Sequence, residues 1–186
     1  MIAFIDETQA DLRQGDARYV LIAAAVVKGE ADRTRDDLRR LLLPRQRRLH
    51  WNEERAARRD RIVEAISRME FTSYAAVEPY ARPTLEQRAR ASCFHALLPA
   101  LVDAGVVEVV VERRDEHLDR ADRQTIAAMI RYGQMPREFR YRFSRPGDEP
   151  LLWLADALAG VTRESLLGSR SYLDQLGGKG PTILPG

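Results

Sequence analysis

The chain has 186 residues, 45% hydrophobic and 31% charged, with a formal net charge of +2, which excludes both a wholly disordered chain and an overall polycation. The longest uninterrupted apolar run, 20–27, is far shorter than the roughly 20 residues that span a bilayer, so no membrane partner is expected. The N-terminus lacks the basic segment of a signal peptide and Cys93 is the single cysteine, so we expect a cytoplasmic protein without a disulfide framework or a multi-cysteine zinc site.

Short apolar runs predict two antiparallel strands at the start of the chain, over 2–6 and 18–27, joined by a polar turn at 11–16. A helical insertion, about residues 30–69, is expected next. It contains helices over 32–43 and 55–69, with a loop over 45–54 between them.

The second half of the chain alternates strands and helices. The pattern predicts a strand over 71–77, a helix that Thr84 caps and Gly105 ends, a buried strand over 106–112, a helix over 122–132, a polar edge strand over 137–144 and a last helix over 151–167. The fold class is therefore α/β, with a mixed five-stranded sheet flanked by helices. One domain is expected over 1–168, followed by a flexible tail over 169–186 that is rich in glycine and proline. The edge strand could pair with a second copy, which leaves a homo-oligomer open.

Three carboxylates stand at positions that favour a shared site. Asp6 follows two apolar residues on one face of the first strand, and Glu112 ends the valine-rich strand, where ligands of open α/β sheets tend to bind. Asp156 interrupts the apolar last helix, and an ionised Asp there is costly unless it is paired or bound to a cation. Clustered carboxylates favour a divalent cation, and oxygen ligands favour Mg²⁺ or Mn²⁺ over zinc.

Each acid also has a simpler explanation. A carboxylate at the end of a strand is often a turn former, and Asp156 could form an ion pair with Arg163 or another arginine. His50 could act as a general acid or base near a phosphate, or it could hydrogen-bond a loop carbonyl. These alternatives stay open at the level of the sequence.

Arginines are concentrated in one segment. Residues 33–68 contain 12 arginines against six acids, although the whole chain is almost neutral. Guanidinium groups match phosphate oxygens, so this segment is a candidate contact for the backbone of RNA or DNA. The same mixture of charges is also typical of a solvated helix face.

Three motifs resemble those of the large, mostly bacterial family labelled domain of unknown function 3800, which has a ribonuclease H-like fold. Ile5-Asp6-Glu7-Thr8 is similar to the family's Asp-Glu-Ser strand end, and Leu49-His50-Trp51 is similar to its short histidine motif. The stretch 154–160, Leu-Ala-Asp-Ala-Leu-Ala-Gly, is similar to its helix motif near the C-terminus. The resemblance spans residues 1 to about 168.

The resemblance implies a metal-dependent nuclease in which Asp6, Glu112 and Asp156 hold Mg²⁺ or Mn²⁺. Glu7, His50 and Glu53 are supporting candidates for the site. The chain departs from the family pattern at three places: Glu112 stands where Asp is more common, Arg48 stands where an acid commonly precedes the histidine motif, and Trp153 stands where Gln is common. Arg48 removes a metal ligand that Glu53 could replace. The alternative is therefore a catalytically inactive ribonuclease H-like module that binds nucleic acid or protein.

Overall fold

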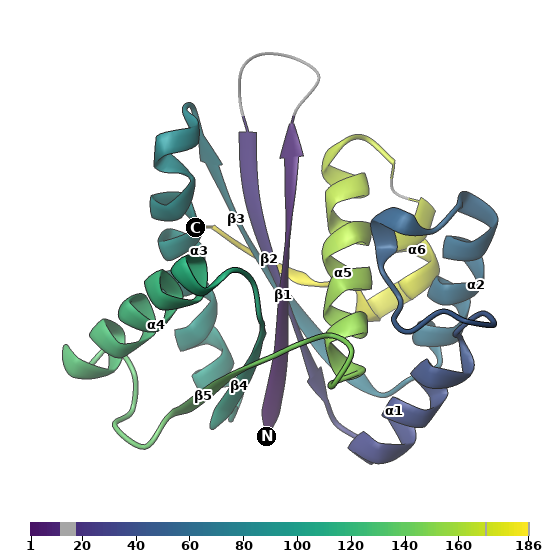
Figure 1. Ribbon diagram of the computed structural model, residues 1–186, viewed down its shortest axis with the longest axis horizontal. Coiled ribbons are helices and arrows are strands. Elements are labelled where there is room, and N and C mark those ends of the chain that lie inside the picture. Colours follow the sequence, from purple (N-terminus) through teal and green to yellow (C-terminus); the bar gives the residue numbers. More distant parts are fainter. Residues whose placement is uncertain (12–17, 170, 186) are drawn as a thin grey trace.

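A mixed six-stranded sheet runs through the middle of the molecule, with helices on both faces (Figure 1). The computed structural model describes residues 1–11, 18–169 and 171–185. The strand order is β5-β4-β1-β2-β3-β6. β1, β2 and β3 are antiparallel neighbours, whereas β4 is parallel to β1, β5 to β4 and β6 to β3. The strands are β1 (Ile2–Asp11), β2 (Arg18–Val27), β3 (Phe71–Tyr80), β4 (Glu108–Glu112), β5 (Arg140–Ser144) and β6 (Thr182–Pro185).

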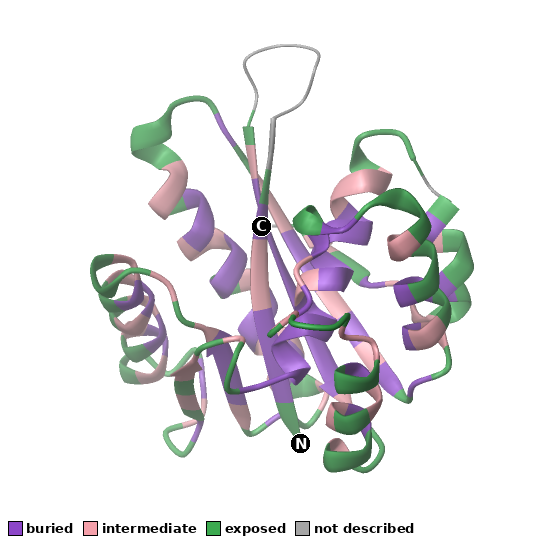
Figure 2. Cartoon of the chain, turned by 45° about the vertical axis from the view of Figure 1, so that its right-hand side comes forward, coloured by how far each residue is buried: buried purple, intermediate pink, exposed green. Residues whose placement is uncertain are grey.

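Two hydrophobic cores cover the two faces of the sheet, because successive side chains of a strand point to opposite sides. Phe4 of β1 joins the core under α1, α2, α5 and α6, and Ile5 joins the core under α3 and α4. Figure 2 shows the resulting burial in the sheet, with exposed residues on the outer sides of the helices. The helices are α1 (Ala31–Arg40), α2 (Ala56–Ser67), α3 (Glu86–Asp103), α4 (Glu116–Arg131), α5 (Leu151–Leu166) and α6 (Ser171–Leu176), with short 3-10 helices η1 (Trp51–Glu53), η2 (Pro83–Leu85) and η3 (Gly177–Lys179).

α5 is the helix that shapes the centre of the molecule, and it packs on β1 and β2. Every residue from Leu151 to Thr162 is buried except Asp156, which is half-buried. A helix that is apolar on all sides must be surrounded by protein, and here the sheet lies on one side while α1, α2 and α6 contact the other sides. Asp156 is therefore held in apolar surroundings by the fold.

The α/β class, the mixed sheet and the flanking helices predicted from the sequence are confirmed. The number of strands is six and not five, because the expected flexible tail contains α6 and the edge strand β6. α1, η1 and α2 lie between β2 and β3, within the segment expected to be a helical insertion. The expected turn at 11–16 falls almost wholly on residues 12–17, which lie outside the described part of the chain.

Several element boundaries also differ from the prediction. α4 begins at Glu116, six residues earlier than predicted from the position of Asp122. Thr84 lies in η2 and forms no side-chain cap of α3. Gly105 does follow the C-terminus of α3 with a φ of +84°, a backbone conformation that glycine adopts without a steric penalty. Within the described residues, no helix has the length and apolar character that crossing a membrane requires.

Candidate functional site

Two neighbouring strands bring Asp6 and Glu112 together. β4 is parallel to β1 and its register pairs Val111 with Ile5, so the next residues along the two strands are Glu112 and Asp6. Alternation from Phe4 and Val110, which share one core, directs both acids to the face that α5 covers. The buried valines of β4 thus set the position of Glu112, as the sequence predicted.

The carboxyl groups of Asp6 and Glu112 lie close enough to influence each other's ionisation. Burial and the nearby charges of Glu112 and Asp156 raise the pKa of Asp6 well above its ordinary value, and the Arg90 guanidinium opposes this shift. Burial and the charge of Asp156 also raise the pKa of Glu112. Ionisation of both carboxyl groups is therefore unfavourable unless a cation offsets their negative charge.

Asp156 of α5 completes a cluster of three acids. Its Oδ2 atom accepts a hydrogen bond of 2.6 Å from the backbone N–H of Trp51. Burial raises the pKa of Asp156, and this hydrogen bond opposes the increase. Among the described residues Asp156 has no arginine partner, and the Nε of Arg163 is itself buried without a hydrogen-bond partner. The ion pair with Arg163 that the sequence left open is therefore not formed.

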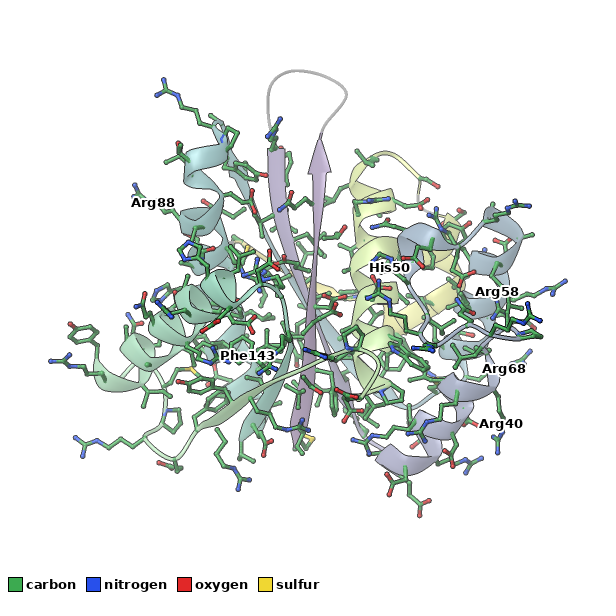
Figure 3. All side chains as sticks on the ribbon, viewed as in Figure 1. Arg40, His50, Arg58, Arg68, Arg88 and Phe143 are labelled. Atoms are coloured by element: carbon green, nitrogen blue, oxygen red, sulfur yellow. The ribbon has the colours of Figure 1, made fainter. Side chains whose placement is uncertain are left out.

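The short helix η1 and the loop before it lie over the three acids, where Figure 3 shows His50 beside α5. The charges of His50 and Arg48 both favour the ionised forms of Glu112 and Asp156. The Nδ1 atom of His50 is buried and has no hydrogen-bond partner among the described residues, so the bond to a loop carbonyl is not formed at that nitrogen. Glu53 lies at the rim, with its side chain 63% exposed and 3.5 Å from Arg48, and its charge disfavours ionisation of Asp156.

Glu7, predicted as a supporting metal ligand, lies on the other face of the sheet from Asp6. Its Oε1 is 3.0 Å from Arg114, its Oε2 contacts Arg90, and both arginines also bind the fully buried Asp122 of α4. The structure thus places Glu7 in a buried ion network and not in the cluster of acids. Strand alternation predicts that Glu7 and Asp6 face opposite sides of the sheet, because consecutive residues of β1 cannot face the same side.

Trp51 is a site residue that the sequence reasoning did not single out. It is 2% exposed, its ring contacts Tyr172 edge-on at 5.2 Å, and the Arg59 guanidinium stacks on it at 5.0 Å. A Cβ atom added at Gly160, one helical turn after Asp156, would fall on the Trp51 ring. The absence of a side chain at Gly160 therefore lets Trp51 approach α5, where its backbone N–H donates a hydrogen bond to Asp156. In the sequence, this contact was indicated only by the presence of both the Leu-His-Trp motif and the motif that ends in Ala-Gly.

An open groove of about 670 Å³ leads to Glu112. Four arginines line it, together with two acids and a short loop. Another cavity, of about 680 Å³, lies between α1 and α2 and contains none of the predicted site residues. Of the three acids, Glu112 is the one that lines the groove.

The fit of a metal to this cluster rests on the donor chemistry. Within 1–11, 18–169 and 171–185, no three His, Cys, Asp or Glu side chains are arranged closely enough to hold one ion. The three acids nevertheless offer only oxygen donors. Burial is the main cause of their raised pKa values, repulsion from neighbouring acids adds to it, and a divalent cation relieves that repulsion. Asp6, Glu112 and Asp156 thus suit a hard cation such as Mg²⁺ or Mn²⁺ by chemistry.

Comparison with known proteins gives no further assignment. No protein-family model matches the chain, and a search of curated proteins finds no significant relative.

Proposed function

We propose that this protein is a metal-dependent nuclease that hydrolyses phosphodiester bonds of RNA or DNA on a ribonuclease H-like domain related to the domain of unknown function 3800 family. One observation carries the proposal: Asp6, Glu112 and Asp156, separated along the chain, interact at one place, and no arginine forms an ion pair with them among the described residues. A cluster of buried acids without an arginine ion pair costs stability, which favours a functional explanation.

The sheet arrangement supports the fold part of the proposal. β1, β2 and β3 are antiparallel, and two crossover connections then add β4 and β5 parallel to β1. The motifs behind the resemblance also meet in space, because Trp51 contacts both Asp156 and Gly160.

In this proposal Asp6, Glu112 and Asp156 hold the cation, with Glu53 at the rim. A bound Mg²⁺ or Mn²⁺ would activate a water molecule and stabilise the leaving oxygen of a phosphodiester. The Trp51 N–H fixes the orientation of Asp156. His50, with its free Nδ1, can give or take a proton beside the reacting phosphate.

The test is cleavage of labelled RNA and DNA oligonucleotides by Asp156→Asn in the presence of Mn²⁺. We expect the rate to fall about 100-fold or more, the scale of losing one catalytic group, because the substitution removes a cation ligand but keeps the shape of the side chain. Asp103→Asn, an exposed site at the end of α3, is the matched control and should retain the wild-type rate. Equal cleavage by wild-type protein and Asp156→Asn would refute the proposed site.

The second candidate is an inactive module of the same fold. Two observations favour it: Arg48 stands in place of an acid, and the described residues contain no ready group of three metal ligands. Thermal unfolding with and without millimolar Mn²⁺ separates the two, because a ligand that binds only the folded state raises the melting temperature. An increase in the wild-type protein that Asp6→Ala abolishes supports the metal site. The absence of any increase supports the module.

A further inference from the structure

The groove beside Glu112 brings together arginines from three separate parts of the chain. Arg48 precedes η1, Arg113 follows β4 and Arg145 follows β5. Arg145 follows the strand next to that of Glu112, whereas Arg48 belongs to the segment before η1, which contacts α5. The backbone N–H of Arg113 donates to the carbonyl of Ser144, which holds the ends of β4 and β5 together. The spacing of Arg113 and Arg145 is thus set by the sheet.

Arg145 of the groove differs in its ion pairs from most arginines of the 33–68 segment. Seven of the 12 arginines in that segment have carboxylate partners: Arg35, Arg39, Arg40, Arg48, Arg58, Arg59 and Arg68. Figure 3 shows Arg40, Arg58 and Arg68 on the helical insertion, outside the groove. Arg48 is the member of the segment that lines the groove.

Arg145 is the cation most available to a ligand. It is exposed and forms no ion pair with any described residue, whereas Arg113 is 3.5 Å from Asp119 and Arg48 is 3.5 Å from Glu53. Arg114 also lines the groove, but Glu7 and Asp122 neutralise it. Asp115 and Asp148 line the groove as well and oppose an anion, so binding depends on the positions of the arginines and not on a large local excess of positive charge.

We propose that this groove binds the sugar-phosphate backbone of a nucleic-acid strand, with Arg145 and Arg48 contacting phosphates near the one beside Glu112. The inference rests on the proposed function, because the phosphate beside Glu112 is the one that the proposed nuclease would cleave. It adds that the substrate is a polymeric strand. The groove is open, and residues of three segments line it, so it can admit a strand that continues in both directions. Contacts between guanidinium groups and phosphates fix the position of a strand without reading its sequence.

The experiment measures binding of fluorescent single-stranded RNA and DNA 16-mers by anisotropy in a chelator, which prevents cleavage. Arg145→Ala should raise Kd about 5-fold and lower the slope of log Kd against log salt by about 1, the value for losing one phosphate contact. Arg48→Ala should act in the same direction. Arg88→Ala is the matched control, because Arg88 is exposed on α3 (Figure 3), does not line the groove and has no ion pair within the described residues.

The outcomes separate this inference from the proposed nuclease activity. If Arg145→Ala and Arg88→Ala change Kd equally, or the salt slope of Arg145→Ala matches that of the wild type, the groove inference is wrong even when wild-type protein cleaves. If wild-type protein binds through Arg145 but does not cleave with Mn²⁺, the nuclease proposal fails and the groove inference stands. Circular dichroism spectra that match the wild type exclude misfolding as the cause of a loss in affinity.

Discussion

At the scale of single residues, Asp6 shows how function and stability oppose each other. Burial and the charges of Glu112 and Asp156 make ionisation of this carboxyl group costly, and Arg90 offsets only part of that cost. The folded protein therefore binds more protons than the unfolded chain above the ordinary pKa of 3.8. The contribution of the Asp6 carboxyl group to stability is therefore present at acidic pH and is lost as the pH rises through its raised pKa.

Asp6→Asn should therefore raise the melting temperature of the metal-free protein at pH 7.5, since it removes a buried charge and keeps the shape of the side chain. The difference from the wild type should shrink towards pH 4, where Asp6 is protonated in the folded state. Thermal unfolding by circular dichroism in a chelator measures both values, with Asp103→Asn as the exposed control. A wild-type protein that melts above Asp6→Asn at pH 7.5 would contradict the assignment of Asp6 as a strained acid.

At the scale of elements, the contact between η1 and α5 depends on Gly160. Trp51 fills the space that a side chain at Gly160 would take, and its ring is held by Tyr172 and Arg59. Trp51 therefore cannot move away without breaking those contacts. The same contact positions the N–H that orients Asp156.

Gly160→Ala should lower the free energy of unfolding by about 2 kcal/mol. Overpacking against a fixed ring costs up to about 3 kcal/mol, and the higher helix propensity of alanine returns about 1 kcal/mol. Urea unfolding monitored by circular dichroism gives the value. Gly178→Ala is the control, because nothing lies within 4 Å of the added Cβ there and its stability should change by less than about 0.5 kcal/mol. A Gly160→Ala protein as stable as the wild type would show that Trp51 can be displaced freely.

At the scale of the whole molecule, a buried ion network joins β1, α3, α4 and the end of β4 on the face opposite the cluster of acids. Arg90 donates two bonds of 2.8 Å to Asp122, and Arg114 donates one of 2.9 Å. Both arginines also contact Glu7, the residue after Asp6. The network thereby connects β1 beside Asp6 with the segment that follows Glu112 at the end of β4.

Asp122→Asn should destabilise the protein by about 3–5 kcal/mol, because it leaves Arg90, only 4% exposed, without its main counter-charge. The matched control is Asp37→Asn, which removes the exposed partner of Arg40 and should change stability by less than about 1 kcal/mol. Chemical unfolding of both variants provides the comparison. Equal small losses would mean that solvent reaches the network.

The sequence by itself determined the elements whose signals are local. The apolar run of β2, the valines of β4 and the apolar α5 each identify their element because burial requires apolar side chains at the period of that element. Alternation along β1 also determined that Asp6 faces the same side as Phe4. β6 was not predicted, because four residues between glycine and proline carry too little periodicity and the strand forms only by pairing with β3.

Only the tertiary structure decided which charged residues meet. Asp156 could be assigned to an ion pair or to a shared site from the sequence, and the choice depended on α5 packing across β1, with η1 donating an N–H from 105 residues away. In the same way, Arg114 is neutralised by partners on β1 and α4, whereas Arg145 has no ion pair within the described residues. Electrostatic partners are set by distance in space, and a pattern along the chain cannot specify that distance.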